Sequence, residues 1–160
     1  MNGKPSAKFI IVMNLIMDIP MAVVMSIMGP ILAKQPVITP LFPINCLIGF
    51  ALAFFINAVF PISAISAKFA GLFKVKRHSF VENIIGNIPA AAIFVFIIGF
   101  VMNVFDVFIM AKQPFLNAMM AWVFTFVPMW LVCWIIACIF VPIALRCALA
   151  TDGKSIADMQ

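Results

Sequence analysis

The amino-acid sequence predicts an all-α fold of the polytopic membrane class, with four transmembrane helices arranged as two tandem helical hairpins. Of the 160 residues, 66% are hydrophobic and 9% are charged, and the mean hydropathy is +1.24. Soluble domains carry about 25% charged residues, and a water-soluble core cannot absorb this much apolar surface. At about 20 residues per crossing, the length allows about four spanning helices.

The first helix is expected over residues 9–33, and it carries Asp18 near its middle. A carboxylate there costs about 2.5–3.5 kcal/mol on insertion scales, and about a dozen Leu, Ile, Val and Phe residues each return about 0.3–0.6 kcal/mol. The sum is only modestly favourable once Asn14, Pro20 and Pro30 are counted. We therefore expect this helix to need partners in the membrane and Asp18 to face them. The stretch is too long for a signal-peptide core and no small-residue cleavage site follows it, so we expect a retained helix.

Three further apolar stretches predict the remaining helices. A loop with three prolines, residues 34–43, precedes the second helix, which is expected over residues 44–67. A basic loop then leads to the third helix, expected over residues 83–110. After a short turn the fourth helix is expected over residues 118–145, and the tail that follows is polar.

The charged residues indicate the orientation of these helices. Eight Lys and Arg residues lie near the two ends of the chain and in the middle loop, whereas Lys34 and Lys112 lie in the other two loops. The positive-inside rule then places both termini and the middle loop in the cytoplasm, in a multi-pass protein of the cell (inner) membrane. This topology accounts for the net charge of +5, so we expect no nucleic-acid partner. Lys74, Lys76 and Arg77 are candidates for binding anionic lipid headgroups, although topology is their default role.

The chain has the pattern of an internal duplication. The letters AKQP end the first helix at residues 33–36 and the third at residues 111–114. The segment from Asn14 through Asp18 to Pro20 also matches the segment from Asn83 through Asn87 to Pro89, with an offset of 69 residues against 78 for AKQP. Two helices per half predict a parallel repeat, related by an axis along the membrane normal. We therefore expect repeats over residues 1–73 and 74–160 that form one integrated membrane domain.

The fourth helix carries a recognisable pattern. Residues 115–122 are FLNAMMAW, and Pro128, Val141-Pro142 and Arg146 follow. This pattern resembles the second helix of short bacterial inner-membrane proteins of the domain-of-unknown-function 2798 family, whose units are two-helix hairpins. The Met-Ser or Met-Thr pair that lies late in the first helix of that family corresponds to Met25-Ser26 and Met102-Asn103, whereas the first half of the chain lacks the Trp. The resemblance implies a fold and a membrane location, and no activity.

Along each expected helix, the residues four apart form a ridge that is mainly small or polar. Such residues share one face of a helix, and small faces allow close packing in lipid, where no hydrophobic force holds helices together. The pattern is moderately specific for helix–helix contact and weak evidence for a transport path. The ridges comprise 14, 18, 22, 26 and 30; 45, 49, 53, 57 and 61; 83, 87, 91, 95, 99 and 103; and 117, 121, 125, 129, 133 and 137.

Asp18 is the sharpest single candidate for function. In the functional interpretation it takes up and releases a proton in a translocation path, because burial disfavours the charged form of a carboxyl group. In the structural interpretation it is a carboxyl group bonded to Asn or Ser on neighbouring helices. The matching residue of the second repeat is Asn87, so any site is asymmetric.

Other polar residues of the spans are expected to join this site. Amides both donate and accept hydrogen bonds, so they suit a polar cavity, although bonds between helices are their commoner role. Prolines within the spans can kink their helices, and we favour simple bends over broken binding helices. The candidates for the ligand or proton path are Asp18, Asn14, Ser26, Asn57, Asn87 and Asn103.

Several other classes of site find little support. The chain has one His and four Cys without a CxxC pair, so we expect no metal site and no cofactor, and free Cys residues that behave as apolar side chains. No nucleotide-binding motif is present, and the serines lack a nearby base, so we expect no enzyme.

The leading hypothesis is a small transporter or channel component with a polar intramembrane site around Asp18. One bundle has limited room for a solute path, so we expect a homo-oligomer or a membrane-protein partner within the lipid bilayer. The alternative is a non-catalytic subunit that packs against a larger complex. It rests on the small-residue ridges and on the expectation that no second acid lies within the spans.

Overall fold

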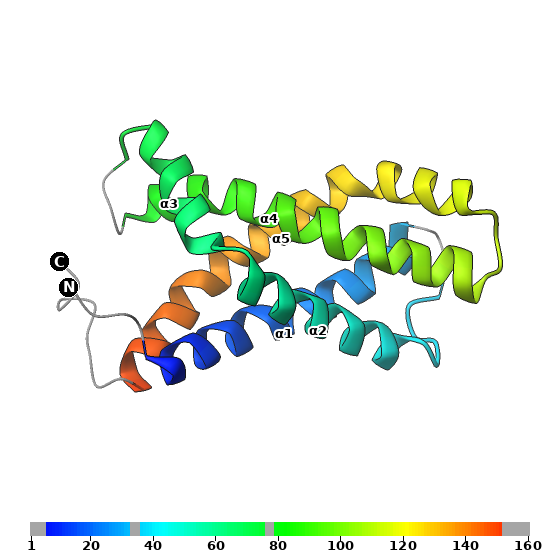
Figure 1. Ribbon diagram of the computed structural model, residues 1–160, viewed down its shortest axis with the longest axis horizontal. Helices are drawn as coiled ribbons and strands as arrows, with labels where there is room; N and C mark the ends of the chain where they lie inside the picture. The colour runs from blue at the N-terminus through cyan, green and yellow to red at the C-terminus, as the bar shows by residue number, and fades with distance from the viewer. Residues whose placement is uncertain (1–5, 33–35, 76–78, 152–160) are drawn as a thin grey trace.

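The computed structural model describes residues 6–32, 36–75 and 79–151 and shows an all-helical chain (Figure 1). Four stretches are long and apolar enough to cross a membrane: Ala7–Leu32, Phe42–Val59, Phe80–Met110 and Phe115–Thr151. No strand occurs in the described residues. The predicted class, an all-α membrane protein with four spanning helices, is confirmed. The helices are α1 (Ala7–Leu32), α2 (Phe42–Val59), α3 (Ile62–Leu72), α4 (Phe80–Asn103), the π-helix η1 (Val104–Met110) and α5 (Phe115–Thr151).

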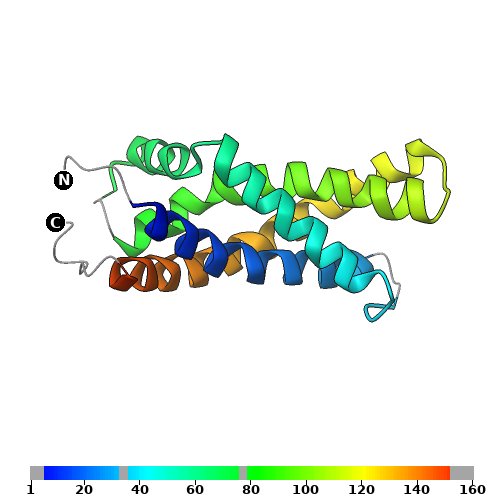
Figure 2. The ribbon, with the colours of Figure 1, turned by 60° about the horizontal axis from the view of Figure 1, so that its bottom comes forward.

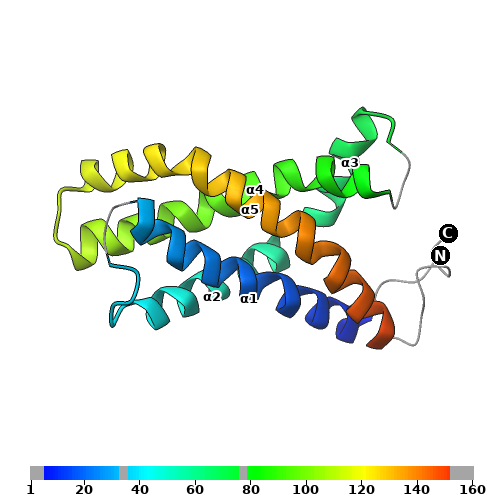
Figure 3. The same ribbon diagram turned by 180° about the vertical axis from the view of Figure 1, so that it is seen from behind.

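The long helix α5 connects the rest of the molecule. It packs against both α1 and α4, while α2 packs on α1 and the short α3 packs on α4. In Figures 1 to 3, the start of α1 and the end of α5 lie side by side at one end of the molecule. That end also carries α3, and η1 lies at the opposite end (Figure 1). These contacts do not test whether the two halves are repeats, so the division at residues 1–73 and 74–160 stays a prediction.

The expected second helix, residues 44–67, is two helices, and the prediction of one continuous helix is wrong. Phe60 is extended, with φ −99° and ψ 133°, as steric contact with a following proline favours. Pro61 has φ −76° and ψ 65°, and the Ile62 amide donates to the Phe60 carbonyl at 2.8 Å, which together form an inverse γ-turn. Pro61 therefore breaks the helix instead of kinking it, and α3 leaves at a new angle.

The expected third helix begins earlier and ends differently. Ser79 caps α4, and its side chain accepts a hydrogen bond from the Glu82 amide at 3.1 Å, so the helix starts at Phe80. Its last seven residues, Val104–Met110, widen into the π-helix η1. The hydrophobic pattern continues through this segment, so periodicity gave no sign of the change.

The core lies where α1, α2, α4 and α5 meet. Apolar side chains fill it, and small residues let the backbones approach. A Cβ on Gly49 would lie 3.5 Å from the Ala22 Cβ, and one on Gly86 would lie 3.2 Å from the Ser66 carbonyl oxygen. Gly49 and Ala22 belong to the small-residue ridges of α2 and α1, so these two ridges pack helix against helix, as their pattern predicted. The buried core cluster comprises Met21, Met25, Ala53, Ile56, Ala91, Phe94, Val95, Ile98, Met102, Met129, Cys133 and Ala137.

Candidate functional site

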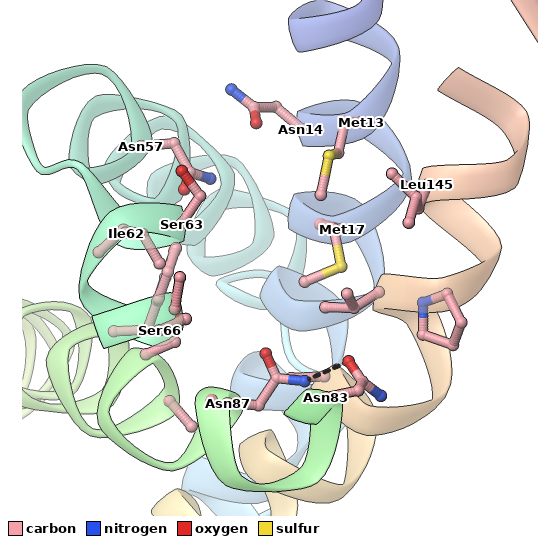
Figure 4. A pocket seen from close by; sticks show the side chains of 18 of the residues that line it. Met13, Asn14, Met17, Asn57, Ile62, Ser63, Ser66, Asn83, Asn87 and Leu145 are labelled. Atoms are coloured by element: carbon pink, nitrogen blue, oxygen red, sulfur yellow. Dashed lines mark hydrogen bonds between the residues drawn. The ribbon is translucent and has the colours of Figure 1, made fainter. Parts of the chain in front are cut away.

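A cavity of about 760 Å³ lies at the end of the molecule where α1 begins and α5 ends. Residues of α1, α3, α4 and α5 line it, together with Asn57 of α2 and the break at Phe60 and Pro61 (Figure 4). It extends from Ser79 at the start of α4 and Arg146 in the last turns of α5 inward to side chains of the core cluster. Spanning helices that diverge from the core therefore enclose a large space at this end of the molecule.

Asp18 lies in the wall of this cavity and is 1% exposed. The Asn57 side-chain amide donates to Asp18 Oδ1 at 2.9 Å, so a hydrogen bond from α2 holds the carboxyl group of α1. Asp18 Oδ2 is buried and has no hydrogen-bond partner among the described residues. Burying a polar oxygen without a partner is costly. The carboxyl group thus has one oxygen bonded by α2 and one oxygen buried without a partner among the described residues.

On α4, Asn83 and Asn87 form a short hydrogen-bonded chain beside the same cavity (Figure 4). Asn87 Nδ2 donates to Asn83 Oδ1 at 2.8 Å, and Asn83 Nδ2 donates to the Cys138 carbonyl at 2.9 Å. In an α-helix that carbonyl would accept from residue 142, but Pro142 has no amide hydrogen. Asn83 therefore replaces the missing donor and ties α4 to α5 at the proline.

The two matched sequence segments meet at this cavity. Asn14 and Asp18 line it from α1, and their counterparts Asn83 and Asn87 line it from α4. Asn83 was not among the predicted site residues, although its spacing of four from Asn87 placed it on the same helix face. The two segments thus make this part of the cavity polar. The α1 segment contributes an acid, Asp18, whereas the α4 segment contributes the amide of Asn87 at the matching position.

Two predicted site residues lie elsewhere. Ser26 is buried in α1 beyond the cavity, and its hydroxyl donates to the Ala22 carbonyl at 2.8 Å. Asn103, near the end of α4, donates to the Gly99 carbonyl at 2.8 Å. Each bonds the carbonyl four residues before it in its own helix, a local alternative open to short polar side chains. Neither lines the cavity around Asp18.

A second acid, Asp106, lies in the span Phe80–Met110, so the expectation of no second acid is wrong. It sits on η1, and Asn45 Nδ2 of α2 donates to both of its carboxyl oxygens at 3.1 Å. Asn45 Oδ1 is buried without a partner among the described residues. A smaller cavity of about 240 Å³ adjoins this pair and is also lined by Pro30, Thr39 and residues near them. The acid was visible in the sequence, but its partner depends on how α2 lies against η1.

Two indole groups fix the wall that α4 and α5 share. Trp130 Nε1 donates to the Ile88 carbonyl at 3.1 Å, and Trp134 Nε1 donates to the Ile84 carbonyl at 2.9 Å. These carbonyls flank the segment of α4 that contains Gly86 and Asn87. The cavity wall opposite α1 is therefore held by hydrogen bonds from α5, in addition to packing.

The basic middle loop is described only in part. Lys74 is exposed and has a positive φ of 52° directly after α3, whereas Lys76 and Arg77 lie outside the described residues. Among the described residues, no group of three or more His, Cys, Asp or Glu side chains is placed to hold a metal ion.

Comparison with known proteins gives no match: no protein-family model, curated protein or solved structure matches the chain. The resemblance to the domain-of-unknown-function 2798 family therefore stays a prediction.

Proposed function

We propose that the protein is a transporter or channel component without enzymatic activity, and that Asp18 is its polar intramembrane site. The observation that carries this proposal is the cavity of about 760 Å³ that extends to an acid with one unpartnered oxygen. Pockets for small molecules commonly measure about 300–1,000 Å³. Ionisable residues inside spans usually mark ion or solute pathways, because a membrane otherwise disfavours them.

The break between α2 and α3 supports the same function. Phe60, Pro61 and Ile62 line the cavity, so irregular backbone faces it directly. In membrane proteins, interrupted helices are typical of substrate and ion sites, since the irregular backbone needs polar or watery surroundings. The core cluster closes the inner end of the cavity. Transport would therefore require the helices to rearrange, or a second subunit to complete the path.

We propose that the cavity opens toward the cytoplasm. Lys8, Lys68, Lys74 and Arg146 lie near the end of the molecule that carries the cavity, whereas Lys112 follows η1 at the opposite end. The positive-inside rule assigns the more basic end to the cytoplasm, in the cell (inner) membrane. Lys74, with Lys76 and Arg77, would then lie beside anionic headgroups of the cytoplasmic leaflet.

Aqueous accessibility tests the proposal. After replacement of the four native cysteines, single cysteines are placed in the cavity as Asn14→Cys and Met17→Cys. The matched controls are Leu15→Cys and Ile19→Cys, at positions 38% and 51% exposed on the outer face of α1. We expect a membrane-impermeant maleimide to label the cavity positions from the cytoplasmic side and to leave the controls unlabelled. Absence of labelling at both cavity positions would indicate a dry seam and a structural Asp18.

The alternative is a non-catalytic membrane subunit of a larger complex. Its first support was the small-residue ridges, but Gly49 of the α2 ridge lies against Ala22 of the α1 ridge in this same chain. Its second support was the absence of another acid, which Asp106 removes. Purification of a stable, partner-free species with flux activity would exclude it, and obligate co-purification with one membrane protein would favour it.

A further inference from the structure

We propose that the Asp18 cavity binds organic cations with a bulky apolar body. The proposal rests on the proposed function for its location and adds the class of ligand. The cavity is large, its walls are mainly apolar, and Asp18, a buried acid with one oxygen unpartnered among the described residues, lies in its wall. The apolar walls favour an apolar body, the carboxyl group disfavours anions, and the large volume disfavours a bare metal ion.

The wall chemistry favours an apolar body. Met13, Met17 and Met21 line one side from α1, where their flexible thioethers can adapt to different shapes. Aromatic rings line the cavity from several elements and can attract a cation to their faces. The aromatic lining residues are Phe9, Phe60, Phe80 and Phe94.

The charge distribution favours a cation. At depth, the polar groups around Asp18 are neutral amides, and one of them, Asn57, already bonds Oδ1. Of the lining residues, Glu82 and Arg146 carry opposite charges, so together they add no net charge to the lining. Other described cations near the same end do not line the cavity: Lys8, Lys68 and Lys74. An anion would meet a buried carboxyl group without a buried cation to offset it. A cation would instead pair its charge with the Asp18 carboxyl group in the cavity wall.

The shape disfavours a bare metal ion. Divalent hard cations are usually held by several oxygen ligands that include carboxylates, and among the described residues Asp18 belongs to no group of three or more His, Cys, Asp or Glu side chains placed to hold a metal ion. A volume of about 760 Å³ would leave most of the space around such an ion unfilled. An ammonium or phosphonium group that carries apolar substituents would fill the space and bring a single charge to Asp18.

Binding to the purified protein in nanodiscs of zwitterionic lipid tests the inference. The probe is tetraphenylphosphonium, and tetraphenylborate is an anion of the same shape. We expect saturable binding of the cation to the intact chain and none of the anion. Asp18→Asn should raise Kd about ten-fold or more, because the buried group that pairs with the charge is lost. Asp106→Asn, which changes an acid outside this cavity, should leave Kd within about two-fold.

A protection experiment keeps the test decisive if Asp18→Asn does not fold. In a protein that retains Asp18, tetraphenylphosphonium should slow maleimide labelling of Asn14→Cys and leave labelling of Thr39→Cys, at the smaller cavity, unchanged. Equal binding of the anion, equal loss with Asp106→Asn, or no protection at position 14 would overturn the inference. Binding without flux would overturn the proposed transport and retain this inference, whereas Asp18-dependent flux of another solute without binding of this probe would do the reverse.

Discussion

Two aspartates within the described helices are each bonded by an asparagine of α2, yet their surroundings differ. Asp18 is 1% exposed, has one oxygen bonded by Asn57 and one unpartnered, and adjoins a cavity of about 760 Å³. Asp106 is partly exposed on a π-helix and has both oxygens bonded by Asn45, beside a cavity of about 240 Å³. A carboxyl group with both oxygens bonded ties helices together. A buried carboxyl group with only one oxygen bonded can still bind a proton or pair with a cation.

The position of the two amides sharpens the comparison. Asn45 and Asn57 lie twelve residues apart on the ridge of α2, which winds by about 120° around the helix over that length, so one winding ridge bonds both acids. Asn57 connects α2 to α1, and Asn45 connects α2 to η1. Hydrogen bonds from α2 therefore reach both halves of the chain, and only the bond to Asp18 lies beside the large cavity.

The largest expected effect is a loss of function from Asp18→Asn. The substituted amide still offers an oxygen to Asn57, so the helices keep their hydrogen bond, but the group that holds a proton or a cation is lost. We expect flux in proteoliposomes to fall about ten-fold or more, while the melting temperature in detergent changes by only a few degrees. Proton-linked flux that survives this substitution unchanged would contradict the assignment of Asp18 as the site.

Asp106→Asn should show the opposite pattern: a loss of stability with flux largely retained. One of the two acceptors for the Asn45 amide becomes a donor, so the contact between α2 and η1 weakens. We expect the free energy of unfolding, measured by titration with a denaturing detergent, to fall by about 1–2 kcal/mol. Flux per folded molecule should stay within about two-fold. If Asp106→Asn abolishes flux in protein that remains folded, the contrast between an anchoring acid and a functional acid is wrong.

Asn83 tests whether every polar group in the Asp18 cavity belongs to the site. Asn83→Ala removes the donor that reaches the Cys138 carbonyl, which Pro142 has left without a helix partner. We expect a loss of about 1–2 kcal/mol in the free energy of unfolding. Pro142→Ala restores an amide hydrogen to α5, so the double variant should recover part of that loss.

The double-mutant cycle separates this role from ligand binding. If Asn83 acts through the Cys138 carbonyl, its substitution should cost less stability in the Pro142→Ala background than in the native chain. Equal costs in both backgrounds would show that the carbonyl does not depend on Asn83. The amide would then be free to take part in the site with Asp18.

The class of the protein and its four spans could be predicted from sequence because hydropathy reports them directly. The break at Pro61 could be located but not distinguished from a kink, since that outcome depends on how α3 packs against α4. Ser26 and Asn103 were assigned to the site on helix face alone, but each bonds its own helix. The partners of Asp18 and Asp106 depend on the register of α2 against its neighbours, which no single-helix pattern contains. The presence of Asp106 within the third span could be read directly from the sequence, because it lies inside the helix expected over residues 83–110.

The smallest expected effect compares two glycines at close helix contacts. At Gly49, between the two amides of α2, an added Cβ would meet the Ala22 Cβ at 3.5 Å, an ordinary contact. At Gly86, in the wall of the Asp18 cavity, it would meet the Ser66 carbonyl oxygen at 3.2 Å, and backbone cannot give way as easily as a side-chain tip. Alanine in a helix gains about 0.5–1 kcal/mol over glycine through reduced chain entropy. Gly49→Ala should therefore be neutral or slightly stabilising. Gly86→Ala should lower the melting temperature by a few degrees, because α3 must move away from α4. If both variants stabilise the protein equally, α3 is free to move, and the wall of the Asp18 cavity is less rigid on this side than on the side that Trp130 and Trp134 hold.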